Sequence, residues 1–169
     1  QGARVYHAAS TMKVPVMIEL FRQADVGTFS LDDSLLVENR FRSIVDGSEF
    51  AIGDDSDDEI YQRLGSQMAI RDLVESMITV SSNLATNILI DCVGANAVQT
   101  TTERLGTEQM QTLRGVEDLK AFEQGLSNRT TSSDLAALML ALVEGRAVNP
   151  GADSQMLDIL ARQQFNEMI

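Results

Sequence analysis

Residues 83–93 read NLATNILIDCV, and this stretch decides the class of fold. Its apolar side chains recur at a spacing that places them on one face of an α-helix. Gly94 follows directly, and glycine commonly ends a helix. We therefore predict a central helix over residues 83–93, buried through a face made by Leu84, Ile88, Leu89 and Cys92.

Helical spacing continues on both sides of this segment. Val14, Met17, Ile18 and Phe21 lie at i, i+3, i+4 and i+7. The remaining predicted helices cover residues 30–36, 60–64, 70–77, 97–105, 131–142 and 156–160. Short strands are expected only at residues 4–7 and 49–52, too little to build a sheet. The sequence thus predicts one mainly α-helical domain over residues 1–169.

Composition excludes several classes of partner. The formal net charge of −12 repels phosphate backbones, so we expect no nucleic-acid partner. No apolar run reaches the length of a membrane span. Cys92 is the only cysteine, which leaves no internal disulfide. The acidic run at residues 54–58 lacks the ligand pattern of a calcium loop, so we expect a solvated loop before a helix and no bound metal.

Ser10-Thr11-Met12-Lys13 forms an S-x-x-K tetrad. On a helix, residues three apart share a face, so the two side chains would lie together. A serine hydroxyl needs a neighbouring base to act as a nucleophile, and a partly buried lysine loses its proton more readily. Taken alone, the tetrad is better explained by a capping serine beside a solvated lysine.

Two later segments change that interpretation. Ser81-Ser82-Asn83 resembles an S-D-N motif with Ser82 in place of the Asp. Residues 114–118 and 128–137 look like an Ω-loop and the helix after it. In this order the chain resembles class A β-lactamase-like serine hydrolases, members of the penicillin-recognising family. The resemblance implies the helical subdomain of the β-lactamase/transpeptidase-like fold, with most of the family's α/β sheet absent from this chain, which therefore looks like a truncated fragment.

The resemblance also implies a role for each matching residue. Ser10 is the residue to be acylated, and Lys13 accepts its proton. Ser81 passes a proton to the leaving nitrogen, while Asn83 binds the substrate amide. Glu117 lies at the spacing of the family's deacylating glutamate, although a solvated loop carboxylate explains it almost as well.

The chain departs from the family in two places. Four residues after Glu117 the family normally has an Asn, where this chain has Ala121. The K-T-G signature is missing, because neither Lys13 nor Lys120 precedes Thr-Gly. In the family that strand supplies an oxyanion-hole donor, and losing one such donor costs about 10²–10³ in rate. We therefore expect this chain to keep the nucleophile and to be weak or inactive as it stands.

Three functions remain open. The first is a serine hydrolase that forms an acyl-enzyme with a β-lactam or a related peptide or ester. The second is a non-catalytic penicillin-binding, penicillin-sensing or interaction domain, and the third is a helical subdomain without activity. No cofactor is implied, and the resemblance suggests a periplasmic or secreted location.

One expectation concerns self-association. The apolar residues that follow Lys13 cover more than one helical face, including Val14, Val16, Ile18 and Phe21. Without the sheet, some of this surface should stay open, and such patches favour association. We therefore expect a homo-oligomer, or a chain that needs its missing strands from another segment.

Overall fold

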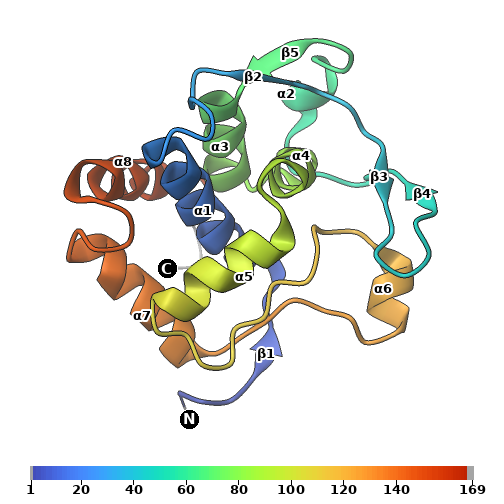
Figure 1. The fold of residues 1–169 in the computed structure, drawn as a ribbon. Coiled ribbons are helices and arrows are strands. Elements are labelled where there is room, and N and C mark those ends of the chain that lie inside the picture. The colour runs from blue at the N-terminus through green and yellow to red at the C-terminus, as the bar shows by residue number, and fades with distance from the viewer. Residues whose placement is uncertain (1, 167–169) are drawn as a thin grey trace.

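A computed structural model describes residues 2–166, and its centre is helix α1 (Lys13–Asp25). Four helices pack directly against α1: α3 (Ile70–Thr79), α4 (Asn83–Val93), α5 (Ala95–Arg104) and α8 (Pro150–Ala161). Helix α7 (Ser132–Val143) packs on α8 at the outer side of this group (Figure 1). The prediction of a mainly helical fold is confirmed.

The strands are short and form three separate antiparallel pairs rather than one sheet. The pairs are β1 (Tyr6–His7) with β6 (Arg129–Thr130), β2 (Ser34–Leu36) with β5 (Gln67–Ala69), and β3 (Phe41–Arg42) with β4 (Glu49–Phe50). Two short helices, α2 (Asp58–Tyr61) and α6 (Leu119–Glu123), lie in the connections. These pieces hold loops in place and do not replace a β-layer.

The helix predicted at residues 30–36 is wrong. The expected cap does form, since the Ser30 N–H donates to the Asp33 carboxylate at 2.8 Å. The chain then leaves this turn as strand β2, whose backbone pairs with β5. A capping sequence also suits an isolated turn, and tertiary pairing decides between the two.

Helix α4 spans the residues that the sequence predicts. Its N-cap is Ser82, whose hydroxyl accepts from the Ala85 N–H at 3.2 Å. Gly94 ends it with a φ of 82°, a left-handed conformation that glycine adopts without strain. Most of the helix is buried, although Cys92, expected on the buried face, is only half-buried.

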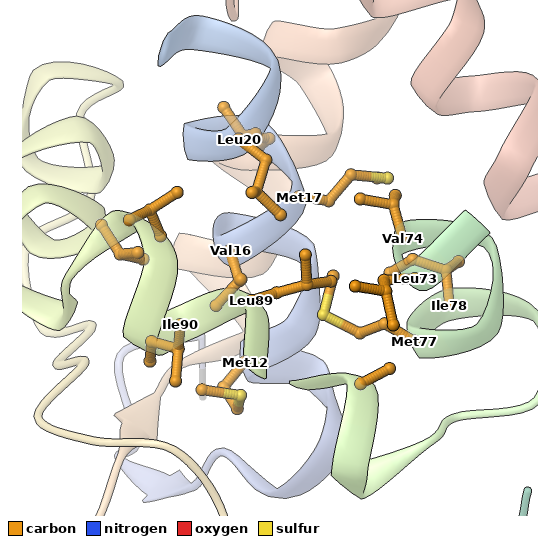
Figure 2. Packing of buried hydrophobic residues seen from close by; sticks show 14 of the residues in the cluster. Met12, Val16, Met17, Leu20, Leu73, Val74, Met77, Ile78, Leu89 and Ile90 are labelled. Atoms are coloured by element: carbon orange, nitrogen blue, oxygen red, sulfur yellow. The ribbon is translucent and has the colours of Figure 1, made fainter. Parts of the chain in front are cut away.

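The hydrophobic core lies where α1, α3 and α4 meet (Figure 2). The side chains of Met17, Leu20, Leu73, Met77 and Leu89 there are completely buried. Long, unbranched methionines fill the irregular gaps between the branched residues. This packing fixes the start of α1 against the start of α4.

The apolar surface expected along α1 is not open. Val16, Ile18 and Phe21 are buried by the neighbouring helices of this chain, and Val14 is half-buried. The larger exposed apolar side chains of the described residues include Leu140 and Val143 on α7 and Leu119 and Phe122 on α6. The expected apolar face of α1 is therefore not available for self-association. In residues 2–166 no helix is long and apolar enough to cross a bilayer.

The core predicts a sharp contrast between two leucines. Leu89 is fully buried, whereas Leu140 is 52% exposed. We expect Leu89→Ala to lower the free energy of unfolding by about 2–5 kcal/mol, because it leaves a cavity. Leu140→Ala serves as the control and should change it by less than about 0.5 kcal/mol. Urea unfolding followed by circular dichroism measures both, and equal effects would contradict the assignment of this core.

Candidate active site

Ser10 is presented on a single 3₁₀ turn, Ala9–Met12, that leads directly into α1. The side chain is exposed at the turn, and the backbone N–H of Ala8 anchors the approach by donating to the Asn128 carbonyl at 2.9 Å. Ala9 has a φ of 46°. A left-handed alanine is costly, so the surrounding contacts must hold this turn in place.

Lys13, the first residue of α1, points its ammonium into the protein. The residue is only 2% exposed, and Nζ donates to three oxygens. These are the Ser81 carbonyl at 2.5 Å, the Ser81 hydroxyl at 2.9 Å and the Asn83 side-chain oxygen at 3.1 Å. The tetrad lysine is thus tied to the S-x-N segment seventy residues later, and is not solvated.

Burial lowers the pKa of Lys13 from 10.5 to about 8, and the negative charge of Asp55 partly opposes this shift. Burial acts in this direction because it disfavours the charged form. At pH 7 about a tenth of the Lys13 side chains are therefore neutral, against fewer than one in a thousand for an ordinary lysine. Such a lysine can accept a proton near neutral pH.

Ser81 connects the nucleophile to this lysine. Its hydroxyl donates to the Ser10 hydroxyl at 3.1 Å and accepts from Lys13 Nζ at 2.9 Å. Among the described residues no hydrogen bond joins Ser10 and Lys13 directly, so the contact expected between them runs through Ser81. Because hydroxyl protons rotate, the same line can carry a proton from Ser10 towards Lys13.

Glu117 lies on the loop before α6, and this loop borders the same pocket as Ser10. With Ser10 and Asn83 it lines a pocket of about 350 Å³. Glu117 is exposed and has a φ of 62°. Together with the hydrogen bonds of Lys13 and Ser81, this brings together all five residues that the sequence singles out.

Two buried asparagines hold the loop that carries Glu117. The Asn87 side chain, on α4, pairs with both backbone groups of Val116, at 2.9 and 2.7 Å. The Asn128 side chain accepts from the Leu113 N–H at 2.8 Å and donates to the Arg114 carbonyl at 2.8 Å. Sequence reasoning missed both, although Asn87 lies one helical turn after Asn83 and so faces the same side.

Gly115 is required for this close approach. A Cβ at this position would lie 2.1 Å from Asn87 Oδ1. Next to it, the Arg114 guanidinium is buried and donates to the carbonyls of Leu126 and Gly115, each at 2.9 Å. Burial lowers the pKa of Arg114, and Asp118 and Glu117 oppose that shift.

Backbone strain is concentrated at this site. Within residues 2–166 the non-glycine residues with positive φ are Ala9, Ser81 and Glu117. Each costs on the order of 1–3 kcal/mol and persists only where its surroundings enforce it. Their clustering around one pocket separates this region from the rest of the fold. No group of three or more metal-ligating side chains occurs in the part of the chain that the structure describes.

The shifted pKa of Lys13 predicts a pH-dependent stability. The folded chain binds fewer protons than the unfolded chain between pH 8 and 10.5, so stability rises with pH across that window. We expect the free energy of unfolding of the wild type, minus that of Lys13→Met, to increase by on the order of 3 kcal/mol over this range.

Urea unfolding at several pH values measures this difference, and Lys120→Met is the control because the Lys120 side chain is 53% exposed. Curves for the wild type and Lys13→Met that run parallel with pH would contradict the burial of the ammonium.

Comparison with known proteins identifies the arrangement. A family model described as "Beta-lactamase enzyme family" matches residues 1–169. A search of curated protein sequences finds no significant match.

Solved structures agree with the family model. A β-lactamase from Sphaerobacter thermophilus is 31% identical, with a TM-score of 0.81 over 96% of this chain. The structure of PBP-A is 31% identical, with a TM-score of 0.79 over 98% of this chain. A PBP-A mutant described as an acyl-enzyme complex with penicillin G is 30% identical, with a TM-score of 0.78 over 98%. This chain spans 57% of the length of each of the three. The chain belongs to the β-lactamase enzyme family.

Proposed function

We propose that this chain carries the acylation machinery of a serine hydrolase that acts on β-lactams or related amides and esters. The observation that carries the proposal is the hydrogen-bonded line from Ser10 through Ser81 to a buried Lys13 with a pKa of about 8. A base in this pKa range is suited to activating a hydroxyl near neutral pH. By resemblance to the family, we also propose a periplasmic or secreted location.

In the acylation step, Ser10 Oγ attacks the carbonyl carbon of the substrate and its proton moves through Ser81 to Lys13. The resulting tetrahedral intermediate collapses when the carbon–nitrogen bond breaks. Ser81 then delivers a proton to the departing nitrogen and is reprotonated from Lys13. The products are an ester on Ser10 and the freed amine, which stays attached when the substrate is a cyclic lactam. Asn83, with its side-chain oxygen on Lys13, lines the pocket for the substrate amide.

Deacylation is assigned to Glu117. Its carboxylate takes a proton from a water molecule, which attacks the carbonyl carbon of the ester. The bond between that carbon and Ser10 Oγ then breaks, and the proton held by Glu117 passes to Ser10 Oγ. Ala121 weakens this step, because it is buried where the family's second water-binding side chain is expected. Its N–H donates to Asp118 Oδ1 at 3.1 Å, and its methyl side chain has no polar group for a water molecule.

The same observation supports the alternative of a penicillin-binding or penicillin-sensing domain. Such a domain needs acylation but not rapid turnover, and slow deacylation would follow from Ala121. The two functions differ only in the lifetime of the acyl-enzyme. A domain with no activity of its own remains the third possibility, and it differs from both in never becoming acylated.

Acylation gives the first test. Incubation with penicillin G should increase the mass of the intact chain by one whole penicillin molecule, located on Ser10 by peptide mapping. The adduct should form slowly, because the sequence lacks the K-T-G motif and its oxyanion-hole donor. Ser10→Ala should abolish the adduct, and Lys13→Met should slow its formation by about 10²–10⁴-fold, the usual contribution of a general base. Ser132→Ala, at an exposed position of α7, is the control and should acylate as the wild type does. No adduct on the folded wild-type chain, even at long times, would contradict the proposed acylation.

Deacylation gives the second test. Glu117→Gln should leave the rate of acylation unchanged and lengthen the life of the adduct by about 10²–10⁴-fold, because the water loses its base. The measurement is the decay of the adduct by intact-mass spectrometry after excess penicillin is removed. Glu123→Gln, at an exposed position of α6, is the matched control. Equal lifetimes in the wild type and Glu117→Gln would assign the chain to the binding or sensing alternative.

A further inference from the structure

The acidic loop at residues 54–58 is not simply solvated. Its side chains bind the turn between α3 and α4, which carries Ser81. Asp57 caps α2, accepting from the Glu59 N–H at 3.2 Å. The other oxygen of Asp57 accepts from the Ser76 hydroxyl near the end of α3. Ser56 donates to the Val80 carbonyl at 2.6 Å. The loop is thus hydrogen-bonded to the end of α3 and to the turn that leads from α3 to Ser81.

Asp55 reaches the opposite side of that turn. Its two carboxylate oxygens accept from the backbone N–H groups of Asn83 and Leu84, each at 2.8 Å. Tyr61 and Ser82 donate their hydroxyls to it at 3.3 and 3.4 Å. The first turn of α4 therefore has two acceptors, its own N-cap Ser82 and a carboxylate from 28 residues earlier.

This double capping bears directly on Ser81. Ser81 has a φ of 59° and lies between Val80, held by Ser56, and Asn83, held by Asp55. Its carbonyl and hydroxyl both accept from Lys13, as does the Asn83 side chain. A shift at the start of α4 would move all three oxygens away from the ammonium at once.

The sequence explains why a carboxylate from another segment would be useful at the N-terminus of α4. The family motif that Ser81-Ser82-Asn83 resembles has an Asp in its middle position, and this chain has Ser82 there. A negative charge at a helix N-terminus is favourable, and an ionised acceptor forms the stronger hydrogen bonds. The Ser82 hydroxyl offers no such charge.

We propose that Asp55 is a positioning residue for the proposed acyl transfer: its carboxylate fixes the first turn of α4, and with it the Ser81 and Asn83 oxygens that bind Lys13. Asp55 does not touch the reacting atoms. It acts on them through backbone hydrogen bonds, and this inference rests on the proposed function only for its catalytic consequence.

Asp55 also acts on Lys13 through its charge, which favours the protonated ammonium. Other titratable groups face the same region. Glu117, Arg114 and His7 line the pocket, and Tyr61 and Asp57 lie on the Asp55 side. Of these groups, Asp55 is the one whose charge raises the pKa of Lys13. Its two effects can be separated, because loss of charge lowers that pKa whereas entry of water raises it.

The test is a titration of Lys13 by carbon-13 NMR on the 169-residue chain with labelled lysine. The chain has only two lysines, and the exposed Lys120 provides an internal reference. Asp55→Asn keeps one acceptor oxygen and removes the charge, so the pKa of Lys13 should fall by about half a unit to one unit. Asp55→Ala removes the acceptor as well and lets water reach the ammonium, so its pKa should lie above that of Asp55→Asn.

Asp54→Asn is the matched control, since Asp54 is exposed and accepts no hydrogen bond from the described residues. It should shift the pKa of Lys13 by less than about 0.2 of a unit, as expected for a screened surface charge. Circular dichroism verifies that each variant is folded. If Asp55→Asn moves the pKa no more than Asp54→Asn, the proposal is overturned. If Asp55→Ala and Asp55→Asn give the same pKa, Asp55 acts by charge alone and positions nothing.

This readout does not depend on whether Ser10 reacts. A chain that shows the expected pKa changes but is never acylated would contradict the proposed function and leave the positioning role intact. In a chain that is acylated, Asp55→Asn should also move the rise of the acylation rate to lower pH, in step with the pKa of Lys13.

Discussion

The burial of the Lys13 ammonium is the constraint on which the rest of this structure depends. A buried cation is tolerated only where oxygens surround it, and three oxygens from Ser81 and Asn83 do so. Those oxygens come from the start of α4, so α1 and α4 must cross at one particular place. The completely buried Met17, Met77 and Leu89 set that crossing. The packing of the core therefore also determines the geometry of the site around Lys13.

Strain follows from the same constraint. Ala9, Ser81 and Glu117 each hold a left-handed backbone at the point where a segment enters the pocket. A left-handed residue turns the chain abruptly and lets a side chain reach a site that a regular helix or strand would pass by. Each of these turns is secured by polar contacts of neighbouring residues: Ala8 on Asn128, Ser56 on Val80, and Asn87 on Val116. The cost of strain is thus met by hydrogen bonds of the residues next to these turns.

Sequence reasoning succeeded where the signal is local. The apolar spacing and the caps of α4 lie within residues 82–94, and its bounds were predicted correctly. The S-x-x-K and S-x-N segments are local patterns too, but only the resemblance to the family joins them into one predicted site. The prediction failed at β2, where a local cap was present but pairing with β5 decided the outcome. It failed again for α1, because its apolar faces are covered by helices whose arrangement is not encoded in α1 itself.

The residues that hold the site in place could not be predicted from the sequence, because their contacts are not local. Asp55, Asn87 and Asn128 act on backbone groups between 14 and 29 residues away, and a backbone N–H carries no sequence signature. Because these contacts are made by backbone groups, the residues that provide them can change side chain without losing the contact. A motif names the groups that meet the substrate, whereas the groups that hold the motif need only an acceptor or a donor in the right place. In this chain a carboxylate meets the first turn of α4, and it comes from Asp55, 28 residues before Asn83.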